Sequence, residues 1–132
     1  MPPVSLIATA VGAIAGFMLG GVWYGPLFGK AWMAEHGFTQ ADVEKGFNPA
    51  KTYGLMFLMS LIAAYFFGLF LGPKPDLWFA TGAGFAAGLF WVSFSIGTNY
   101  LFERSSLRLF LINGGYHVVR FTLMGAAFGL LG

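Results

Sequence analysis

Four long apolar stretches that contain no acidic residue constrain this chain more than any other feature. They run over about residues 4–24, 49–71, 77–102 and 107–131. A helix needs about 20 apolar residues to cross the roughly 30 Å hydrocarbon core of a bilayer. We therefore expect an all-α integral membrane protein, in which one transmembrane domain covers residues 1–132 and four spans form a helix bundle. The lipid bilayer is the first partner that this pattern implies.

The composition excludes several other classes of protein. Hydrophobic residues make up 58% of the chain and charged residues 9%, whereas soluble domains contain about 25% charged residues. A net charge of +2 gives no basic surface for nucleic acid. The absence of cysteine excludes a disulfide framework and thiolate chemistry. Two histidines and no paired carboxylates inside a span also argue against a metal site, a cofactor or an enzyme.

Local signals predict where several helices begin and end. Asn48 followed by Pro49 is a good N-cap with proline in the first helical position. Gly37 is placed to end a short helix. Thr39 and Asp42, three residues apart, form a weak capping box that opens a further turn of helix.

The first loop, residues 26–46, is predicted to lie in the headgroup layer as a short interfacial helix. Its apolar residues recur at i,i+4 spacing, and tryptophan and tyrosine favour membrane interfaces. Two roles stay open for this loop: a surface connector, or a gate or docking element. The interface motif consists of Trp23, Tyr24, Pro26, Lys30 and Trp32.

Basic residues predict the orientation of the chain in the membrane. Five of the six Lys and Arg residues outside the centres of the spans fall in the first and third loops, and only Lys74 falls in the second. Cytoplasmic loops are enriched in Lys and Arg, so we expect both termini outside the cytoplasm. No Lys or Arg precedes the first apolar stretch, so we expect a retained helix rather than a cleaved signal peptide.

Glycines at four-residue spacing predict close helix packing, because small residues let backbones approach in lipid. Two interpretations stay open: packing within one chain, or a homo-oligomer formed through the first span. The glycines are Gly12, Gly16, Gly20, Gly84, Gly88, Gly125 and Gly129. The pattern Ala-Gly-Phe-x-x-Gly-x-x-Trp occurs at residues 15–23 and again at residues 83–91, either through duplication or by coincidence.

Two segments together resemble a known family. They are Trp23-Tyr24-Gly25-Pro26-Leu27-Phe28-Gly29-Lys30-x-Trp32-Met33 and Leu111-Ile112-Asn113-Gly114-Gly115-Tyr116-His117-Val118-Val119, followed by Met124-Gly125-Ala126. The chain resembles, over nearly its whole length, the small bacterial membrane proteins of domain-of-unknown-function family 1761. This resemblance implies four helices in a bacterial inner membrane and implies no catalytic residue.

A polar stripe on the fourth span is the main candidate site. At about 100° per residue, Asn113, Tyr116, His117 and Arg120 fall within an arc of about 100°. Arg120 lies about 20 Å along the helix from Leu107, near the middle of the membrane. The free energy of inserting an arginine at that depth is unfavourable by about 2.5–3.5 kcal/mol. No span contains a carboxylate that could pair with it.

The third span is predicted to face this stripe with Trp91, Ser95 and Asn99, and Trp91 to stack on Arg120 as a cation–π pair. Two functions stay open. The stripe binds or conducts a small anionic or polar solute, or a lipid headgroup, through the donors of Arg120 and His117. Alternatively, the protein is a non-transporting structural component that binds lipid or a partner, and the stripe only fixes helix packing.

Overall fold

The computed structural model describes residues 4–132, and all regular secondary structure in that part of the chain is helical, as predicted. Two of the long helices contain a π-helical segment, marked η, in which a turn contains about one residue more than an α-helical turn. The elements are α1 (Leu6–Val22), η1 (Trp23–Leu27), α2 (Gly29–His36), α3 (Gln40–Glu44), α4 (Pro49–Leu71), α5 (Leu77–Ala86), η2 (Ala87–Ser93), α6 (Phe94–Glu103) and α7 (Leu107–Leu131).

The helix termini confirm the predicted capping signals. The Asn48 side chain accepts a hydrogen bond from the backbone N–H of Lys51, and Pro49 occupies the first turn of α4. Gly37 ends α2 with a left-handed φ of 69°, a conformation that glycine adopts without steric cost. Thr39 and Asp42 form the capping box of α3.

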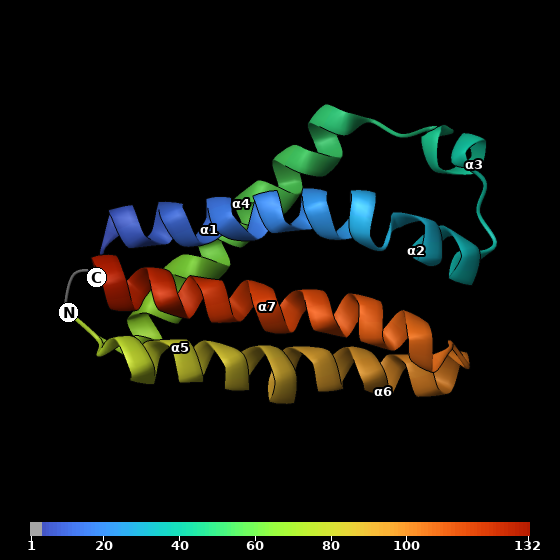
Figure 1. Cartoon of the computed structure of the whole chain (residues 1–132). Helices are drawn as coiled ribbons and strands as arrows, with labels where there is room; N and C mark the ends of the chain where they lie inside the picture. Colours follow the sequence, from blue (N-terminus) through green and yellow to red (C-terminus); the bar gives the residue numbers. More distant parts are fainter. Residues whose placement is uncertain (1–3) are drawn as a thin grey trace.

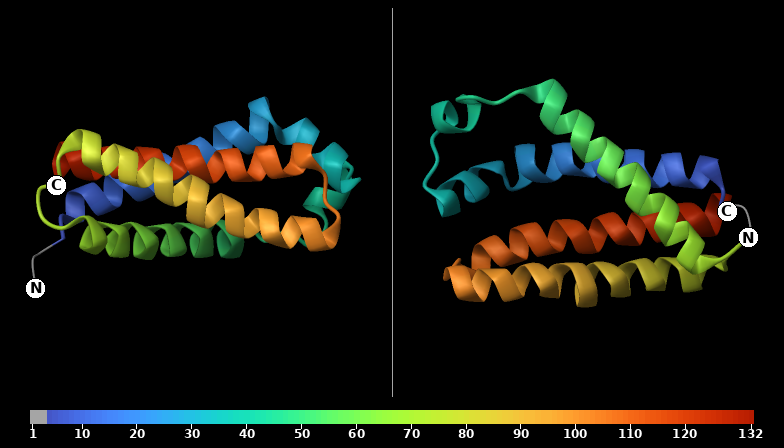
Figure 2. Two further views of the ribbon diagram at one scale, coloured as in Figure 1. Left: turned by 90° about the horizontal axis from the view of Figure 1, so that it is seen from below. Right: turned by 180° about the vertical axis from the view of Figure 1, so that it is seen from behind.

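The α7 helix is the central element of the fold (Figure 1). α1 lies along one side of α7, and the continuous helix of α5, η2 and α6 lies along the other, both antiparallel to α7. α4 crosses these helices obliquely and packs mainly on α1 (Figure 2). The Phe17 ring of α1 packs edge to face on Tyr53 and Phe57 of α4, at centroid distances of 6.0 and 5.8 Å.

The buried core is narrow and is built largely from small residues. Its buried members are Ala8, Ala64, Phe67, Ala87, Met124 and Phe128. Large apolar side chains instead cover the outside of the helices, where Leu101, Phe102 and Trp78 are each more than 80% exposed. Such an apolar surface needs a hydrocarbon solvent, as expected for helices that face lipid.

Three helices of the described chain are long and apolar enough to cross a membrane: Leu6–Leu27, Pro49–Leu71 and Leu77–Glu103. Each coincides with one of the apolar stretches seen in the sequence, and α1 and α5 reach this length because the π-helical segments continue them. α7 contains 25 residues, which is about 37 Å of helix. Its length is sufficient, but its polar residues make it less apolar than the other three.

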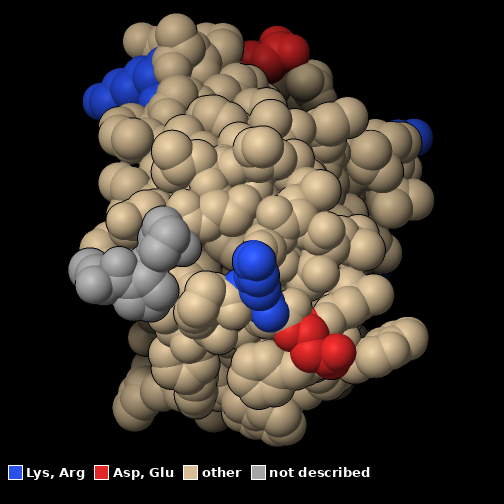
Figure 3. Space-filling model, turned by 90° about the vertical axis from the view of Figure 1, so that its left-hand side faces the viewer, with Lys and Arg blue, Asp and Glu red and all other residues tan. Residues whose placement is uncertain are grey.

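Basic residues of the loops gather at one end of the molecule. α2 and α3 lie at the same end as the α6–α7 turn, whereas α4 begins beside the middle part of α1 (Figure 1). The α4–α5 turn lies at the other end, with the start of α1 and the end of α7, where the Ser5 hydroxyl donates to the Leu131 carbonyl at 3.2 Å. This second end presents few charged side chains (Figure 3).

Candidate functional site

The Asn113 side chain joins three helices through two short hydrogen bonds. The Tyr24 hydroxyl in η1 donates to Asn113 Oδ1 at 2.6 Å, and Asn113 Nδ2 donates to the Tyr100 hydroxyl in α6 at 2.6 Å. We call this arrangement the Asn113 bridge. It ties the helices on both sides of α7 to the central helix, one to two turns closer to the basic end than His117 and Arg120.

Tyr116 and Trp23 tie α7 to α1 directly. The buried Tyr116 hydroxyl donates to the Gly16 carbonyl at 2.9 Å, and Trp23 Nε1 donates to the Ile112 carbonyl at 2.8 Å. Tyr24 and Tyr116 also pack edge to face, with a centroid distance of 5.3 Å. The two sequence segments that carried the family resemblance therefore contact each other in the fold.

His117 and Arg120 differ from the rest of the stripe because they keep unpartnered polar atoms. His117 Nδ1, Arg120 Nε and Arg120 Nη1 are buried and have no hydrogen-bond partner within residues 4–132. The guanidinium carbon of Arg120 lies 4.7 Å from the centroid of the Phe121 ring. The aliphatic part of Arg120 packs against Gly16, where an added Cβ would come within 2.9 Å of Arg120 Cγ.

Gly84 and Gly88 of the third span pack on α7 as predicted, but the predicted placement of Trp91, Ser95 and Asn99 on the same face is wrong. Trp91 is 63% exposed and packs edge to face on Phe70 of α4, so it does not stack on Arg120. Ser95 is exposed and donates to the Trp91 carbonyl within its own helix. Asn99 is also exposed. None of these three side chains belongs to the site.

The π-helical segment η2 causes this difference. The prediction assumed about 100° per residue throughout the span, but the wider π turn rotates every later residue relative to α7. Ser93 is brought to the interface instead and is 1% exposed. Its hydroxyl lies 2.6 Å from the Gly88 carbonyl and 2.8 Å from the Gly114 carbonyl. Ser93 and Tyr100 are the residues of this span that sequence reasoning missed.

The glycine stripes face helices of the same chain. An added Cβ would clash with backbone at Gly84, Gly88, Gly125 and Gly129 and with a side chain of α7 at Gly16, and it would make tight contacts of 3.3 Å with side chains of α7 at Gly12 and Gly20. The nearest atoms are Met124 Cγ for Gly12, Arg120 Cγ for Gly16, Tyr116 Oη for Gly20, the Phe121 carbonyl for Gly84, the His117 carbonyl for Gly88, the Ala80 carbonyl for Gly125 and Leu77 Cα for Gly129. Of the two interpretations of the first-span stripe, the structure supports packing within one chain, because α7 covers Gly12, Gly16 and Gly20.

The predicted interfacial segment also contacts α7. Pro26 lies within η1, so the first helix continues to Leu27. Trp32 of α2 is half-buried among the rings of Tyr24, His36 and Phe38, whereas Lys30 is exposed. The Glu35 carboxylate accepts a hydrogen bond from the Ser106 hydroxyl, the N-cap of α7.

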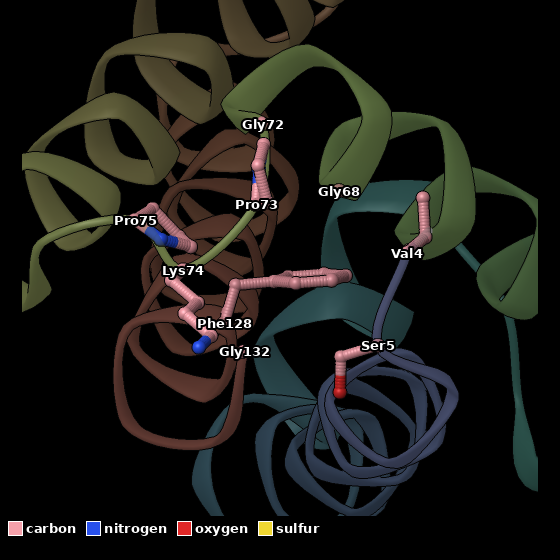
Figure 4. A pocket seen from close by; sticks show the side chains of 9 residues that line it. All are labelled: Val4, Ser5, Gly68, Gly72, Pro73, Lys74, Pro75, Phe128 and Gly132. Atoms are coloured by element: carbon pink, nitrogen blue, oxygen red, sulfur yellow. The ribbon is translucent and has the colours of Figure 1, made fainter. Parts of the chain in front are cut away.

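Two cavities lie away from the polar stripe. One, of about 230 Å³, is at the end that carries the start of α1 and the end of α7 (Figure 4). Its lining includes Lys74, Ser5 and the ring of Phe128. The other, of about 510 Å³, is a mainly apolar groove between α6 and α7 whose lining includes Tyr100. Within residues 4–132, no group of three or more His, Cys, Asp or Glu side chains could hold a metal ion.

The apolar helices around a polar central helix define a small helical membrane protein. The chain belongs to the family described as "Protein of unknown function (DUF1761)", whose family model matches residues 7–129. This match confirms the resemblance drawn from the sequence motifs. No curated protein and no solved structure matches the chain.

Proposed function

We propose that this protein binds a small anionic or polar solute at His117 and Arg120, inside a membrane domain of four spans. The single observation behind this proposal is the set of unpartnered atoms: the three buried side-chain nitrogens without a partner in residues 4–132 lie within one turn of α7. Buried polar groups in proteins are nearly always hydrogen-bonded, so such a cluster indicates a missing water, ion or ligand. Guanidinium donors favour carboxylate and phosphate groups.

The rest of the stripe supports a packing role. Asn113 and Tyr116 make hydrogen bonds within the chain, so they need no solute. These bonds favour the second candidate function, a non-transporting component that binds lipid or a partner and in which the whole stripe fixes helix register. The two candidates differ in one measurable property, which is the access of water to His117 and Arg120.

Thiol labelling tests this difference, because the chain has no natural cysteine. In membranes, His117→Cys should react with a charged, membrane-impermeant thiosulfonate if a solute reaches the site. Met124→Cys is the matched control, because Met124 lies one to two turns further along α7 and is 0% exposed. If both cysteines resist labelling equally, only the packing role of the polar stripe remains.

Loss of binding provides the second test. We expect the purified protein to bind acetate or phosphate, measured by titration calorimetry, and expect Arg120→Lys and His117→Ala each to weaken that binding at least about tenfold. Arg108→Gln is the control, because Arg108 is an exposed arginine at the start of the same helix. Unchanged binding in both site variants would reject the solute site.

The proposed topology has α7 as the fourth span, both termini outside the cytoplasm, and a bacterial inner membrane as the location. Support comes from the shared position of the start of α1 and the end of α7, and from the elements at the opposite end, which carry Lys30, Lys45, Arg104 and Arg108. An alkaline phosphatase fusion after Gly132 should be active, whereas a fusion within residues 38–47 should be inactive. The reverse pattern would invert the orientation.

A homo-oligomer would need a face other than the covered stripe of α1. Gly21 and Gly25 provide one, since an added Cβ at either position meets no atom within 4 Å. Cross-linking in membranes tests this face: an oligomer band lost in Gly21→Leu but kept in Gly82→Leu, which is equally open, would support a homo-oligomer through the first span.

A further inference from the structure

Arg120 is the only fully charged side chain in the interior of the long helices. Every other Asp, Glu, Lys or Arg in these helices lies within three residues of a helix end: Lys51 in α4, Glu103 in α6 and Arg108 in α7. Arg120 lies 13 residues from the start of α7 and 11 from its end. His117 at neutral pH is mainly an uncharged imidazole that can still donate one hydrogen bond, so a ligand at this site meets one positive charge and no second cation.

The surroundings of the guanidinium leave two of its in-plane donors buried and without a partner in residues 4–132. The Phe121 ring covers one face of the group at 4.7 Å, and Gly16 packs on the aliphatic stem. The N–H bonds of Arg120 Nε and Nη1 lie in the guanidinium plane, and neither atom has a partner within residues 4–132. An oxyanion whose oxygens approach in that plane satisfies these donors, and His117 Nδ1 lies on the same face of α7 for a third contact.

We infer that the ligand of this site is a small, singly charged oxyanion, of the carboxylate or phosphodiester class. This inference rests on the proposed function and adds the charge of the ligand to it. One guanidinium neutralises one negative charge. A second negative charge would stay buried without a counter-ion, which is strongly unfavourable at low dielectric constant. We expect monoanions to bind at least about tenfold more tightly than dianions of similar size.

The experiment compares acetate with sulfate at neutral pH and equal ionic strength. The protein is placed in phosphatidylcholine nanodiscs, and the shift in unfolding temperature is measured against anion concentration. Sulfate stabilises folded proteins in general, so the shift seen with Arg120→Gln is subtracted from that of the wild type. The expected result is a saturable difference with acetate and none with sulfate.

Three results separate the possible failures. A larger saturable difference with sulfate than with acetate would overturn the inference about charge while leaving the anion site in place. No difference with either anion would overturn the proposed function itself. If Arg120→Gln does not fold, sulfate competition against acetate binding by the wild-type protein gives the same comparison: displacement of acetate by equimolar sulfate contradicts the inference.

A second set of nanodiscs, which contain an anionic lipid, identifies the source of the monoanion. Phosphatidylglycerol carries a singly charged phosphodiester, so nanodiscs containing it present the same chemistry from a headgroup. Weaker acetate binding in those nanodiscs would support a lipid headgroup as the occupant of the site. Unchanged acetate binding would support a free solute, and both results retain the singly charged ligand.

Discussion

At two glycines, α5 and α7 approach so closely that no side chain fits between them. This close packing yields a quantitative prediction of stability. A Cβ built on Gly84 would lie 2.1 Å from the Phe121 carbonyl oxygen, and a Cβ on Gly125 would lie 2.1 Å from the Ala80 carbonyl oxygen. An ordinary contact begins near 3.4 Å, so Gly84→Ala requires the two helices to separate by about 1.3 Å. Both partners are backbone atoms, which cannot rotate away.

The expected cost of Gly84→Ala is therefore the cost of overpacking, about 1–3 kcal/mol. Alanine also raises helix propensity by about 1 kcal/mol, so the net loss of stability should be about 0–2 kcal/mol, and Gly84→Ala should be about 1–3 kcal/mol less stable than a variant that gains the propensity without the clash. Gly82→Ala is the matched control, because Gly82 lies in the same helix and an added Cβ there meets no atom within 4 Å. We would measure unfolding in detergent micelles. A Gly84→Ala protein as stable as Gly82→Ala would refute this account of the interface.

Three further predictions concern the polar contacts of α7. Ser93→Ala should reduce stability by about 0.5–1.5 kcal/mol, because its hydroxyl is shared between two buried carbonyls; unfolding in micelles measures the loss. Tyr24→Phe should reduce stability by about 1 kcal/mol, because Asn113 Oδ1 loses its donor, and the same assay applies. Trp91→Leu and Arg120→Gln should be additive within about 0.5 kcal/mol in a double-mutant cycle, because Trp91 packs on α4 instead.

Matched variants provide the controls for these predictions. Thr98→Ala removes a hydroxyl that donates to a carbonyl of its own helix at an exposed position, so it should change stability less than Ser93→Ala. Tyr65→Phe removes an exposed hydroxyl and should change stability less than Tyr24→Phe. Equal effects within either pair, or a coupling well above 0.5 kcal/mol between Trp91 and Arg120, would contradict the contacts described above.

Helix boundaries could be predicted from the sequence because their causes are local. The cap at Asn48, the capping box at Thr39 and the left-handed glycine at Gly37 each depend on residues within four positions. The polar stripe was also predictable, since α7 is a regular helix over its whole length. Constant rotation per residue places Asn113 and Arg120 on one face, as the periodicity indicated.

The partners of the stripe could not be predicted, because a π turn leaves no clear mark in a sequence. The segment η2 brings Ser93 to α7 and turns Trp91 outward. The segment η1 continues the first helix past Tyr24, so that its hydroxyl reaches Asn113. Both segments lie beside the polar part of α7, and π-helical turns occur frequently at functional sites. In the third span the segment η2 was enough to replace the predicted partners Trp91, Ser95 and Asn99 by Ser93 and Tyr100.

The repeated sequence pattern explains how the most polar long helix can lie at the centre of a membrane domain. Gly16 and Gly84, equivalent positions of the repeat, approach α7 from two sides at the neighbouring residues Arg120 and Phe121. Gly20 and Gly88 do the same at Tyr116 and His117. These glycines let the two neighbouring helices pack closely on α7, and in the proposed four-span topology this contact would reduce the area of α7 that faces lipid and the cost of Arg120. The low hydropathy of α7 is therefore compatible with the proposed fourth span, because the helices on both sides of α7 take the place of lipid at these contacts.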